Sequence, residues 1–363
     1  MNSARRVATA ILAVLVSTAL AASAAAQIVL AQAPTPPAPR EVLPPKTKAK
    51  PKPHKRAPAQ PAQPGPAATV PAPAAAAAPA RDIDAAFAAF QRGQFLTAFE
   101  LATKRANENG DMKAMTLLGE LHANGFGVGQ DDAKAAEWYR LAADRGDREA
   151  MFALAMFRIG GRAGPANREE AAKLLASAAK LGHVAANYDL GLLYLEGQLF
   201  PQDYARAAEL FGSAAQAGSA EAQYALATLY KEGRGVPSDP REAARLLGAA
   251  AAADYTDAQV EYAIALFNGT GVAKDEAAAA ALLRKAARKG SPIAQNRLAQ
   301  VLVTGRGLPA DPVEAIKWHL AAKAAGASDL KLDDFMQKQN SDVRAAGEKA
   351  AQPWLELIKQ SRS

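Results

Sequence analysis

Residues 219–254 read SAEAQYALATLYKEGRGVPSDPREAARLLGAAAAAD, and this stretch decides the fold because the chain repeats its pattern. Between residues 111 and 326 the sequence divides into six units of 36 residues, with no insertion or deletion. Positions 4, 25 and 32 of the unit are always alanine, and position 15 is always glycine. The units begin at Asp111, Asp147, His183, Ser219, Tyr255 and Ser291. Such a sustained register predicts a repeat architecture.

Each unit has the pattern of two helices joined by a turn. In the first half, apolar residues fall at i, i+4 and i+7, as in Ala186, Leu190 and Leu193, which makes one helical face. The glycine at position 15 ends this helix, because glycine adopts the left-handed C′ conformation without steric cost. Position 21 is always Asp or Asn and predicts the N-cap of a second helix: Asp131, Asn167, Asp203, Asp239, Asp275 and Asp311.

The alanine columns indicate that these helix pairs stack closely. Position 9 is also small in every unit: Gly119, Ala155, Gly191, Ala227, Ala263 and Ala299. Small side chains let helix backbones approach one another, so we predict an all-α fold. Its architecture is a right-handed α/α superhelical solenoid of six 36-residue helix hairpins with helical caps. Residues 81–110 are the N-terminal cap, 111–326 the repeats, and 327–363 the C-terminal cap and tail, with a helix break expected near Pro353.

A polar residue at position 5 recurs every 36 residues in four of the units, as Asn187, Gln223, Gln259 and Gln295. We interpret this column as hydrogen bonds between neighbouring repeats, and contact with a ligand is the alternative.

The N-terminus has the composition of an export signal. Arg5 and Arg6 precede an apolar run of 16 residues, Val7 to Ala22, and small residues suitable for cleavage follow. We therefore predict a signal peptide over residues 1–26 and a periplasmic location. The alternative is an uncleaved segment that anchors the chain in the inner membrane.

Residues 27–80 are predicted to be a disordered linker rich in Pro, Ala and Lys. Residues 31–80 hold 15 of the 23 prolines together with six basic residues between Lys46 and Arg56. Such a composition cannot bury enough apolar surface to offset its ordering entropy. The linker is either a solvated spacer or a contact for anionic cell wall, polysaccharide or lipid.

The distribution of charge argues against nucleic acid as a partner. The formal net charge is +7, but residues 1–80 hold nine Lys and Arg against one acid, Glu41. Residues 81–363 are nearly neutral, with 34 basic and 35 acidic residues, so a basic groove is not expected there. The chain also has no cysteine, which excludes disulfide scaffolds and thiolate chemistry.

The consensus of the units resembles the Sel1-like repeat, a relative of the tetratricopeptide repeat. The matching pattern is A-x-x-x-L-G/A-x-L-Y-x-x-G-x-G-V-x-x-D-x-x-x-A-x-x-W-Y-x-x-A-A-x-x-G, as in residues 222–236 and 138–146. Ala163 and Leu199 depart from it, since each replaces the second loop glycine. The resemblance implies an exported scaffold for protein–protein contact, with roles in envelope regulation, polysaccharide secretion or host interaction.

The residues offer no constellation for catalysis. His122, His183 and His319 lie in different units without a second ligand at metal spacing. The Gly125 to Gly129 segment superficially matches a phosphate-binding loop, but the other units repeat it as a turn between helices. We therefore predict a protein that is not an enzyme, with no catalytic residue, no cofactor and no metal.

Surface positions on the first helices are the best candidates for binding, because in tetratricopeptide-like solenoids these helices line the concave side. The candidates at positions 6 and 14 of the unit are Asn124, Tyr188, Glu196, Tyr224, Glu232 and Asn268. They form a polar and aromatic track for a peptide or partner helix, unless the tyrosines only pack between repeats.

The function predicted from these observations is a monomeric adaptor that docks another envelope or secreted protein in the solenoid groove, regulating envelope signalling or polysaccharide export. The alternative is a factor that binds cell wall or anionic polysaccharide through the basic linker.

Overall fold

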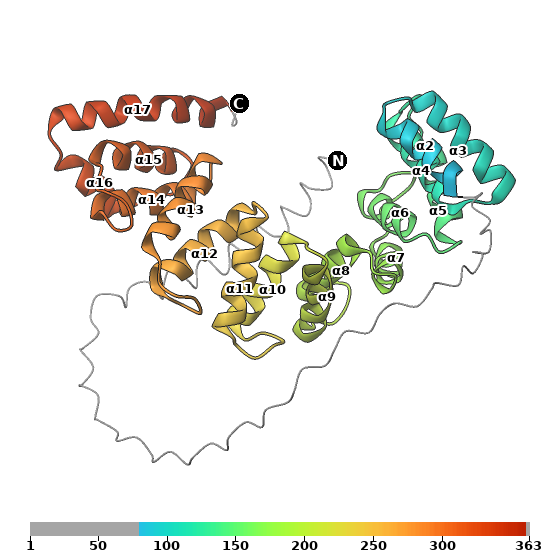
Figure 1. The fold of residues 1–363 in the computed structure, drawn as a ribbon, viewed down its shortest axis with the longest axis horizontal. Coiled ribbons are helices and arrows are strands. Elements are labelled where there is room, and N and C mark those ends of the chain that lie inside the picture. The colour runs from blue at the N-terminus through green and yellow to red at the C-terminus, as the bar shows by residue number, and fades with distance from the viewer. Residues whose placement is uncertain (1–79, 361–363) are drawn as a thin grey trace, which may run out of the picture. The chain divides into compact units, whose positions relative to one another are not determined.

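The computed structural model describes residues 80–360, and the predicted signal peptide and nearly all of the predicted linker lie outside this range. The described chain contains 16 helices and no strand (Figure 1). The N-terminal cap consists of α2 (Ala80–Gln91) and α3 (Phe95–Asn109), so it begins one residue before the predicted boundary. The C-terminal segment consists of α16 (Leu330–Gln337) and α17 (Ser341–Gln360).

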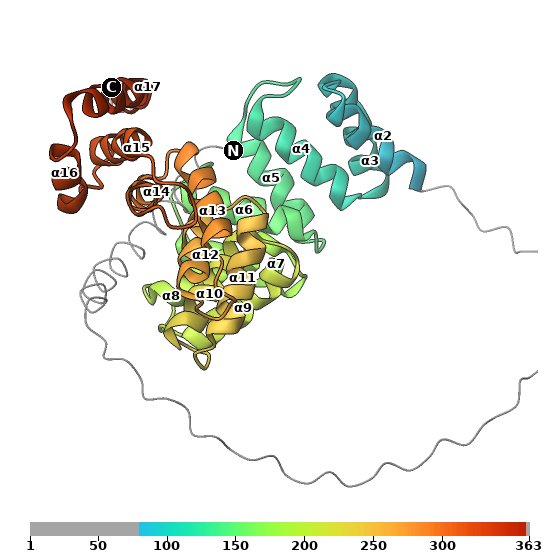
Figure 2. The same ribbon diagram turned by 60° about the vertical axis from the view of Figure 1, so that its left-hand side comes forward.

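Each of the six repeats forms one helix hairpin. The first helices are α4 (Met112–Asn124), α6 (Arg148–Gly160), α8 (Val184–Glu196), α10 (Ala220–Glu232), α12 (Thr256–Asn268) and α14 (Pro292–Thr304). The second helices are α5 (Asp132–Ala143), α7 (Arg168–Lys180), α9 (Tyr204–Gln216), α11 (Pro240–Ala252), α13 (Glu276–Arg288) and α15 (Pro312–Ala324). Every helix from α3 to α14 packs against its successor (Figures 1 and 2), so the all-α solenoid predicted from the repeat is confirmed.

The capping residues act as the sequence predicts. Each Asp or Asn at position 21 accepts a hydrogen bond from a backbone N–H in the first turn of its second helix. Each glycine at position 15 ends its first helix with a φ between 64° and 71°. The closing position of the unit also has a positive φ in all six repeats, and Asp254 adopts 70° where the other repeats have glycine. The glycine column at this position is therefore a backbone requirement.

The first residue of each unit is an N-cap that the sequence analysis did not identify. Asp111, Asp147, Ser219 and Ser291 each accept a hydrogen bond from a backbone N–H in the first turn of the helix that follows. Tyr255 occupies the same place in α12 without a side-chain cap.

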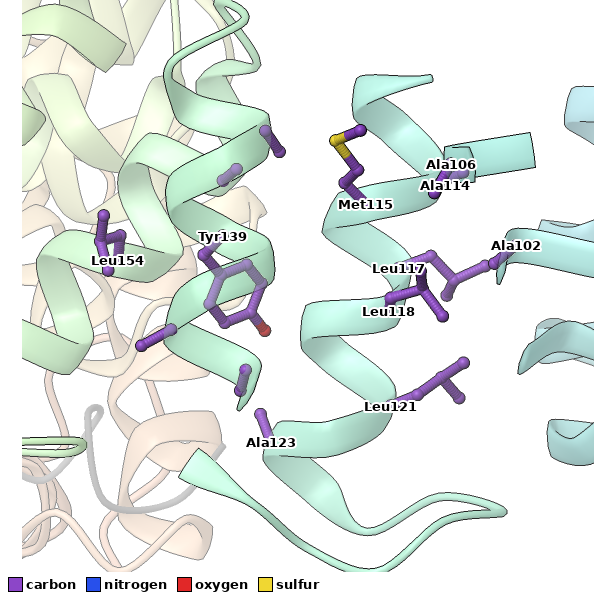
Figure 3. Close-up of a cluster of buried hydrophobic side chains, with 14 of the residues drawn as sticks. Ala102, Ala106, Ala114, Met115, Leu117, Leu118, Leu121, Ala123, Tyr139 and Leu154 are labelled. Atoms are coloured by element: carbon purple, nitrogen blue, oxygen red, sulfur yellow. The ribbon is translucent and has the colours of Figure 1, made fainter. Parts of the chain in front are cut away.

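The small residue at position 9 faces the residue at position 29 of the same hairpin. Position 9 is glycine only where position 29 is a large aromatic, in the pairs Gly119–Tyr139 and Gly191–Phe211. A Cβ atom on either glycine would lie 2.6 Å from the facing ring. The other four repeats combine alanine with leucine or histidine. Figure 3 shows Tyr139 of α5 facing α4 across this contact. The pair at positions 9 and 29 therefore sets the distance between the two helices of a hairpin.

The amides at position 5 join successive repeats. Gln223, Gln259 and Gln295 each donate a hydrogen bond from Nε2 to a carbonyl eight residues earlier, on the second helix of the preceding repeat, at 3.2–3.3 Å. Asn187 does the same from Nδ2 to the carbonyl of Ala179 at 3.4 Å. The hydrogen-bond column predicted from sequence is confirmed.

The second loop glycine lies directly on the preceding repeat. In Gly235, Gly271 and Gly307 a Cβ would overlap backbone atoms at the start of the previous second helix, near Tyr204, Pro240 and Glu276 respectively. The neighbouring arginines reinforce this contact, since Arg306 pairs with Glu276 and Arg162 pairs with Asp132. Ala163 keeps the positive φ of this position, at 58°, without being glycine.

The C-terminal helix differs from its prediction. We expected a break near Pro353, but α17 continues through it to Gln360. Proline has no N–H to donate to the carbonyl of Lys349, and the packing of α17 against α15 offsets this loss. The helix packs against α15, where Gly347 lies on Ile316 and Trp354 contacts Trp318 at 4.9 Å between ring centroids.

The pair at positions 9 and 29 generates the first prediction. Gly191→Ala places a methyl group against Phe211 and should lower the free energy of unfolding by about 1–3 kcal/mol. In the background of Phe211→Leu, which copies the alanine–leucine repeats, the same change should be neutral or stabilising, because alanine favours a helix by about 1 kcal/mol over glycine. Urea unfolding of both single variants and the double variant measures this coupling, and additive effects would contradict it.

The loop glycine generates the second prediction. Gly271→Ala should destabilise the protein by more than Gly290→Ala, by about 2 kcal/mol. Both residues have a positive φ, 72° and 88°, so both variants carry backbone strain. Only Gly271 lies against Pro240, whereas a Cβ on Gly290 meets nothing within 4 Å. Thermal unfolding compares the two, and equal melting temperatures would show that the loop contact contributes nothing.

Candidate functional site

The first helices of neighbouring repeats meet through one recurring contact, in which the side chain at position 6 reaches the first residue of the next unit. Thr116 donates a hydrogen bond from Oγ1 to Asp147 at 3.1 Å. Phe152 stacks on His183 with ring centroids 4.3 Å apart, and Tyr224 contacts Tyr255 at 5.3 Å. Position 6 therefore lies at the junction between first helices, where a side chain both packs and borders the surface.

Both ring nitrogens of His183 have a partner at this junction. Its Nδ1 accepts the N–H of Ala186 at 3.1 Å and so caps α8, while its Nε2 lies 3.0 Å from the carboxylate of Glu149. Because Nδ1 is an acceptor, the imidazole is neutral with its proton on Nε2. Burial lowers the pKa of His183, which favours this neutral form although Glu149 opposes the shift. His183 is thus a structural cap.

Repeats 3 to 5 carry tyrosines and carboxylates together on their first helices. We call this surface the acidic tyrosine face and define it by Tyr188, Asp189, Glu221, Tyr224, Tyr255 and Asp257. Tyr188 and Asp189 belong to α8, Glu221 and Tyr224 to α10, Tyr255 caps α12, and Asp257 lies in its first turn. Positions 3, 6 and 7 of the 36-residue unit lie on one side of the first helix, which explains why five of these residues gather. Tyr255 is at position 1, directly before its helix.

The electrostatics of the tyrosines show that these side chains are close to one another. Burial raises the pKa of Tyr188, Tyr224 and Tyr255, and neighbouring carboxylates raise these pKa values further. Tyr188 is influenced by Asp189 and Glu221, and Tyr255 by Asp257, by Glu221 and by the two other tyrosines. The phenols are therefore neutral, and each keeps an O–H group that can donate a hydrogen bond.

Asp189 is the most perturbed carboxylate of this face. Burial raises its pKa to about 7, and the like charge of Glu221 adds to the shift. Its carboxylate has no hydrogen bond and no ion pair among residues 80–360. Burial likewise raises the pKa of Asp257, with Glu261 as a second cause. Neither carboxylate has a hydrogen bond or ion pair among residues 80–360, and Asp189 is partly buried whereas Asp257 is exposed.

Arginine and lysine side chains of repeats 2 and 4 pair with carboxylates that are not among the six residues of this face. Lys231 pairs with Glu261 at 2.8 Å between α10 and α12. Arg168 pairs with Glu196 at 3.0 Å. Arg234 pairs with Glu232 at 3.3 Å.

The six residues predicted as a binding track separate into three groups. Tyr188 and Tyr224 lie together in the acidic tyrosine face, where Tyr188 also packs against Phe211 at 5.6 Å and Tyr224 against Tyr255. Glu196 and Glu232 form the ion pairs just described. Asn124 and Asn268 are exposed at the ends of α4 and α12. Asn124 donates to the carbonyl of Glu120 in its own helix. Tyr224 thus packs between repeats and Tyr188 packs within its own hairpin, and a role of either residue in binding stays a prediction.

Sequence reasoning missed Asp189, Glu221, Tyr255 and Asp257. The signal was present in the columns at positions 3 and 7, which vary widely among repeats, whereas positions 4 and 9 stay small. An acidic residue in such a column indicates that this position reaches the surface in that repeat, although Leu117 and Ala225 at position 7 are buried. The acids at these positions, with Glu149 and Glu261, occur only in repeats 2 to 5, and repeats 3 to 5 combine them with tyrosine.

The second helices border a different hollow. A cavity of about 540 Å³ lies beside α9 and α11, and its lining includes Gly212, Leu226, Tyr230 and Leu246. Its charged wall residue Glu242 is already paired with Arg245 at 2.6 Å. This hollow therefore offers no unpaired charge comparable with Asp189.

The part of the chain that the structure describes holds neither a metal cluster nor a membrane-spanning helix. Residues 80–360 contain no group of three histidines or acids that could hold a metal ion. Within the same residues no helix is long and apolar enough to cross a membrane.

Comparison with known proteins identifies the family. The Sel1 repeat matches six consecutive segments, residues 113–147, 148–183, 184–219, 220–255, 256–291 and 292–326. These segments are the hairpins described above, and each begins one residue after the unit read in the sequence, except the first, which begins two residues after it. The chain belongs to the Sel1 repeat family.

Solved structures agree with this assignment. One similar structure is c5321, a protective antigen present in uropathogenic Escherichia coli strains and displaying an SLR fold, with 25% identity and a TM-score of 0.54. The similarity covers 76% of this chain and 68% of that one. A Sel1 repeat protein from Oxalobacter formigenes has the same fold, at 23% identity and a TM-score of 0.58, over 72% of this chain and 98% of that one. No protein of curated function matches the chain.

Membership of the family sets the general class of function. Sel1 repeat proteins generally bind protein partners and are generally non-enzymatic scaffolds.

The pKa of Asp189 generates the third prediction. Between about pH 4 and pH 7 the folded state retains a proton that the unfolded state has lost, so the free energy of unfolding falls as pH rises through this window. Asp189→Asn removes the cost of burying an ionised carboxylate and should raise the free energy of unfolding by about 1–2 kcal/mol at pH 8, with the gain vanishing toward pH 4. Urea unfolding at both pH values measures it. Glu348→Gln, at an exposed position in the middle of α17, is the control and should change stability at neither pH; an equal gain in both variants would contradict the prediction.

Proposed function

We propose that this Sel1 repeat protein is an exported, monomeric and non-enzymatic scaffold that docks one envelope or secreted protein on the acidic tyrosine face. The observation that carries the proposal is the combination of packed tyrosines with unpaired carboxylates on three consecutive first helices. Rings held at a repeat junction lose little entropy on binding, so they suit a protein partner. The family's general use as a protein-binding scaffold supports the same function.

The location rests on the N-terminal sequence. Arg5 and Arg6 followed by the apolar run from Val7 to Ala22 support export, and the envelope then supplies the partner. Regulation of envelope signalling or of polysaccharide export are the roles that fit a scaffold in this compartment.

The experiment is chemical crosslinking in intact cells, followed by capture of the full chain and mass spectrometry. We expect one dominant envelope protein with the wild type, and its loss with the double variant Tyr224→Ala and Asp257→Ala. The matched control is Tyr230→Ala with Glu242→Ala, beside the hollow of the second helices, which should retain the partner. Circular dichroism of both variants verifies that the helices persist.

The same experiment tests the second candidate, a cell-wall or polysaccharide factor. This candidate is favoured by the six basic residues from Lys46 to Arg56. Replacing all six by glutamine should leave protein capture unchanged if the scaffold proposal holds. Recovery of wall fragments alone, lost in the glutamine variant, would overturn the scaffold proposal and establish the alternative.

A further inference from the structure

The acidic tyrosine face has more negative charge than the fold itself neutralises. Asp189, Glu221, Asp257 and the neighbouring Glu261 face the tyrosines, and Lys231 is the cation that pairs within this set, with Glu261. Glu221 accepts a hydrogen bond from the hydroxyl of Ser219 at 3.1 Å but has no cationic partner among residues 80–360.

The helix dipole explains only part of this charge. Glu221 and Asp257 lie in the first turns of α10 and α12, where the positive end of the helix favours an anion. Asp189 lies in the second turn of α8, at the sixth residue of the helix, and lacks that stabilisation. A desolvated carboxylate outside the first turn and without a partner costs stability, so a structural role does not account for it.

Tyr188 adds an independent observation that points to a ligand. Its side chain is nine-tenths buried, with 9% of the residue exposed, and it packs on Phe211. Its hydroxyl makes no hydrogen bond among the described residues. The hydroxyl oxygen is not fully buried, so it reaches solvent. Asp189 follows Tyr188 on α8, and the charges of Asp189 and Glu221 both raise the pKa of its phenol. The fold leaves the donor and acceptor capacity of this hydroxyl to solvent or to a ligand.

We propose that the acidic tyrosine face binds a segment of the partner protein that carries arginine or lysine side chains, with a guanidinium or ammonium group between Asp189 and the tyrosine rings. This inference rests on the proposed function and gives the docked segment its chemistry.

Arginine suits the site better than lysine. A guanidinium group pairs with a carboxylate through two N–H groups and also stacks on an aromatic ring, whereas an ammonium group is a single point charge. The fold already uses this arrangement elsewhere, because Arg162 lies 4.0 Å from the ring centroid of Phe157 and Arg234 lies 5.5 Å from that of Tyr204. Tyr224 and Tyr255, 5.3 Å apart, provide such rings beside Asp257.

The test is fluorescence anisotropy of the full chain with labelled nine-residue peptides of alternating alanine and arginine, lysine or glutamate, at physiological salt. We expect the arginine peptide to bind, the lysine peptide to bind about threefold more weakly, and the glutamate peptide not to bind. The triple variant Asp189→Asn, Glu221→Gln and Asp257→Asn should weaken the arginine peptide at least tenfold, in line with charge-assisted hydrogen bonds.

The control triple variant is Glu137→Gln, Glu169→Gln and Glu209→Gln, which makes the same change in net charge at exposed positions of the second helices. It should alter affinity less than twofold. Tyr188→Phe, which removes only the hydroxyl, should weaken the arginine peptide measurably while leaving the helix content unchanged. Equal losses in the two triple variants would overturn the inference, because binding would then follow net charge alone.

The remaining outcomes separate this inference from the proposed function. If no basic peptide binds but the captured envelope protein is still lost with the face variants, the inference fails and the scaffold proposal stands. If the wild type sediments as a dimer that the triple variant dissociates, a second copy occupies the face and the inference also fails. A partner whose bound segment is basic, and whose capture falls with its arginines replaced by glutamine, supports both.

Discussion

The distance between the two helices of a hairpin is the constraint on which the rest of the structure depends. It is set by one pair of side chains, in which a glycine or alanine at position 9 faces a larger residue at position 29. Where the larger residue is Tyr139 or Phe211, the small one is glycine, and the added ring volume is offset within the same repeat. Six hairpins of uniform width can then stack in one register.

That uniform stacking fixes the surface proposed for binding. Amide hydrogen bonds at position 5 and the loop glycines hold each repeat on its predecessor, so a first helix meets the next at a constant register. Constant register brings position 6 of one repeat to position 1 of the next, as with Tyr224 and Tyr255. The tyrosines are thus held by packing that the fold needs anyway. The carboxyl group of Asp189, which has no partner among residues 80–360, is what distinguishes the face from an ordinary repeat junction.

Much of the fold could be predicted from sequence because its signals are local and repeated. A cap such as Asp239 or a terminator such as Gly233 acts within four residues, and the six copies separate pattern from chance. The continuation of α17 through Pro353 was not predictable from the rule that proline breaks helices, since it depends on the packing of α17 against α15. Tyr188 and Tyr224 were predicted because two tyrosines recur at the same position of neighbouring repeats. Asp189 and Asp257 were missed because they are distinguished by the absence of partners, which is a property of three-dimensional packing.

Small residues set the distance between the helices, and this packing presents the acidic tyrosine face to a basic protein segment. Amide hydrogen exchange of the full chain tests this binding most directly. Exchange is compared with and without a saturating arginine–alanine peptide. The account predicts slower exchange concentrated in α8, α10 and the N-terminal turns of α12, with α9, α11 and α13 unchanged. Protection confined to the second helices, or spread evenly over all repeats, would contradict it.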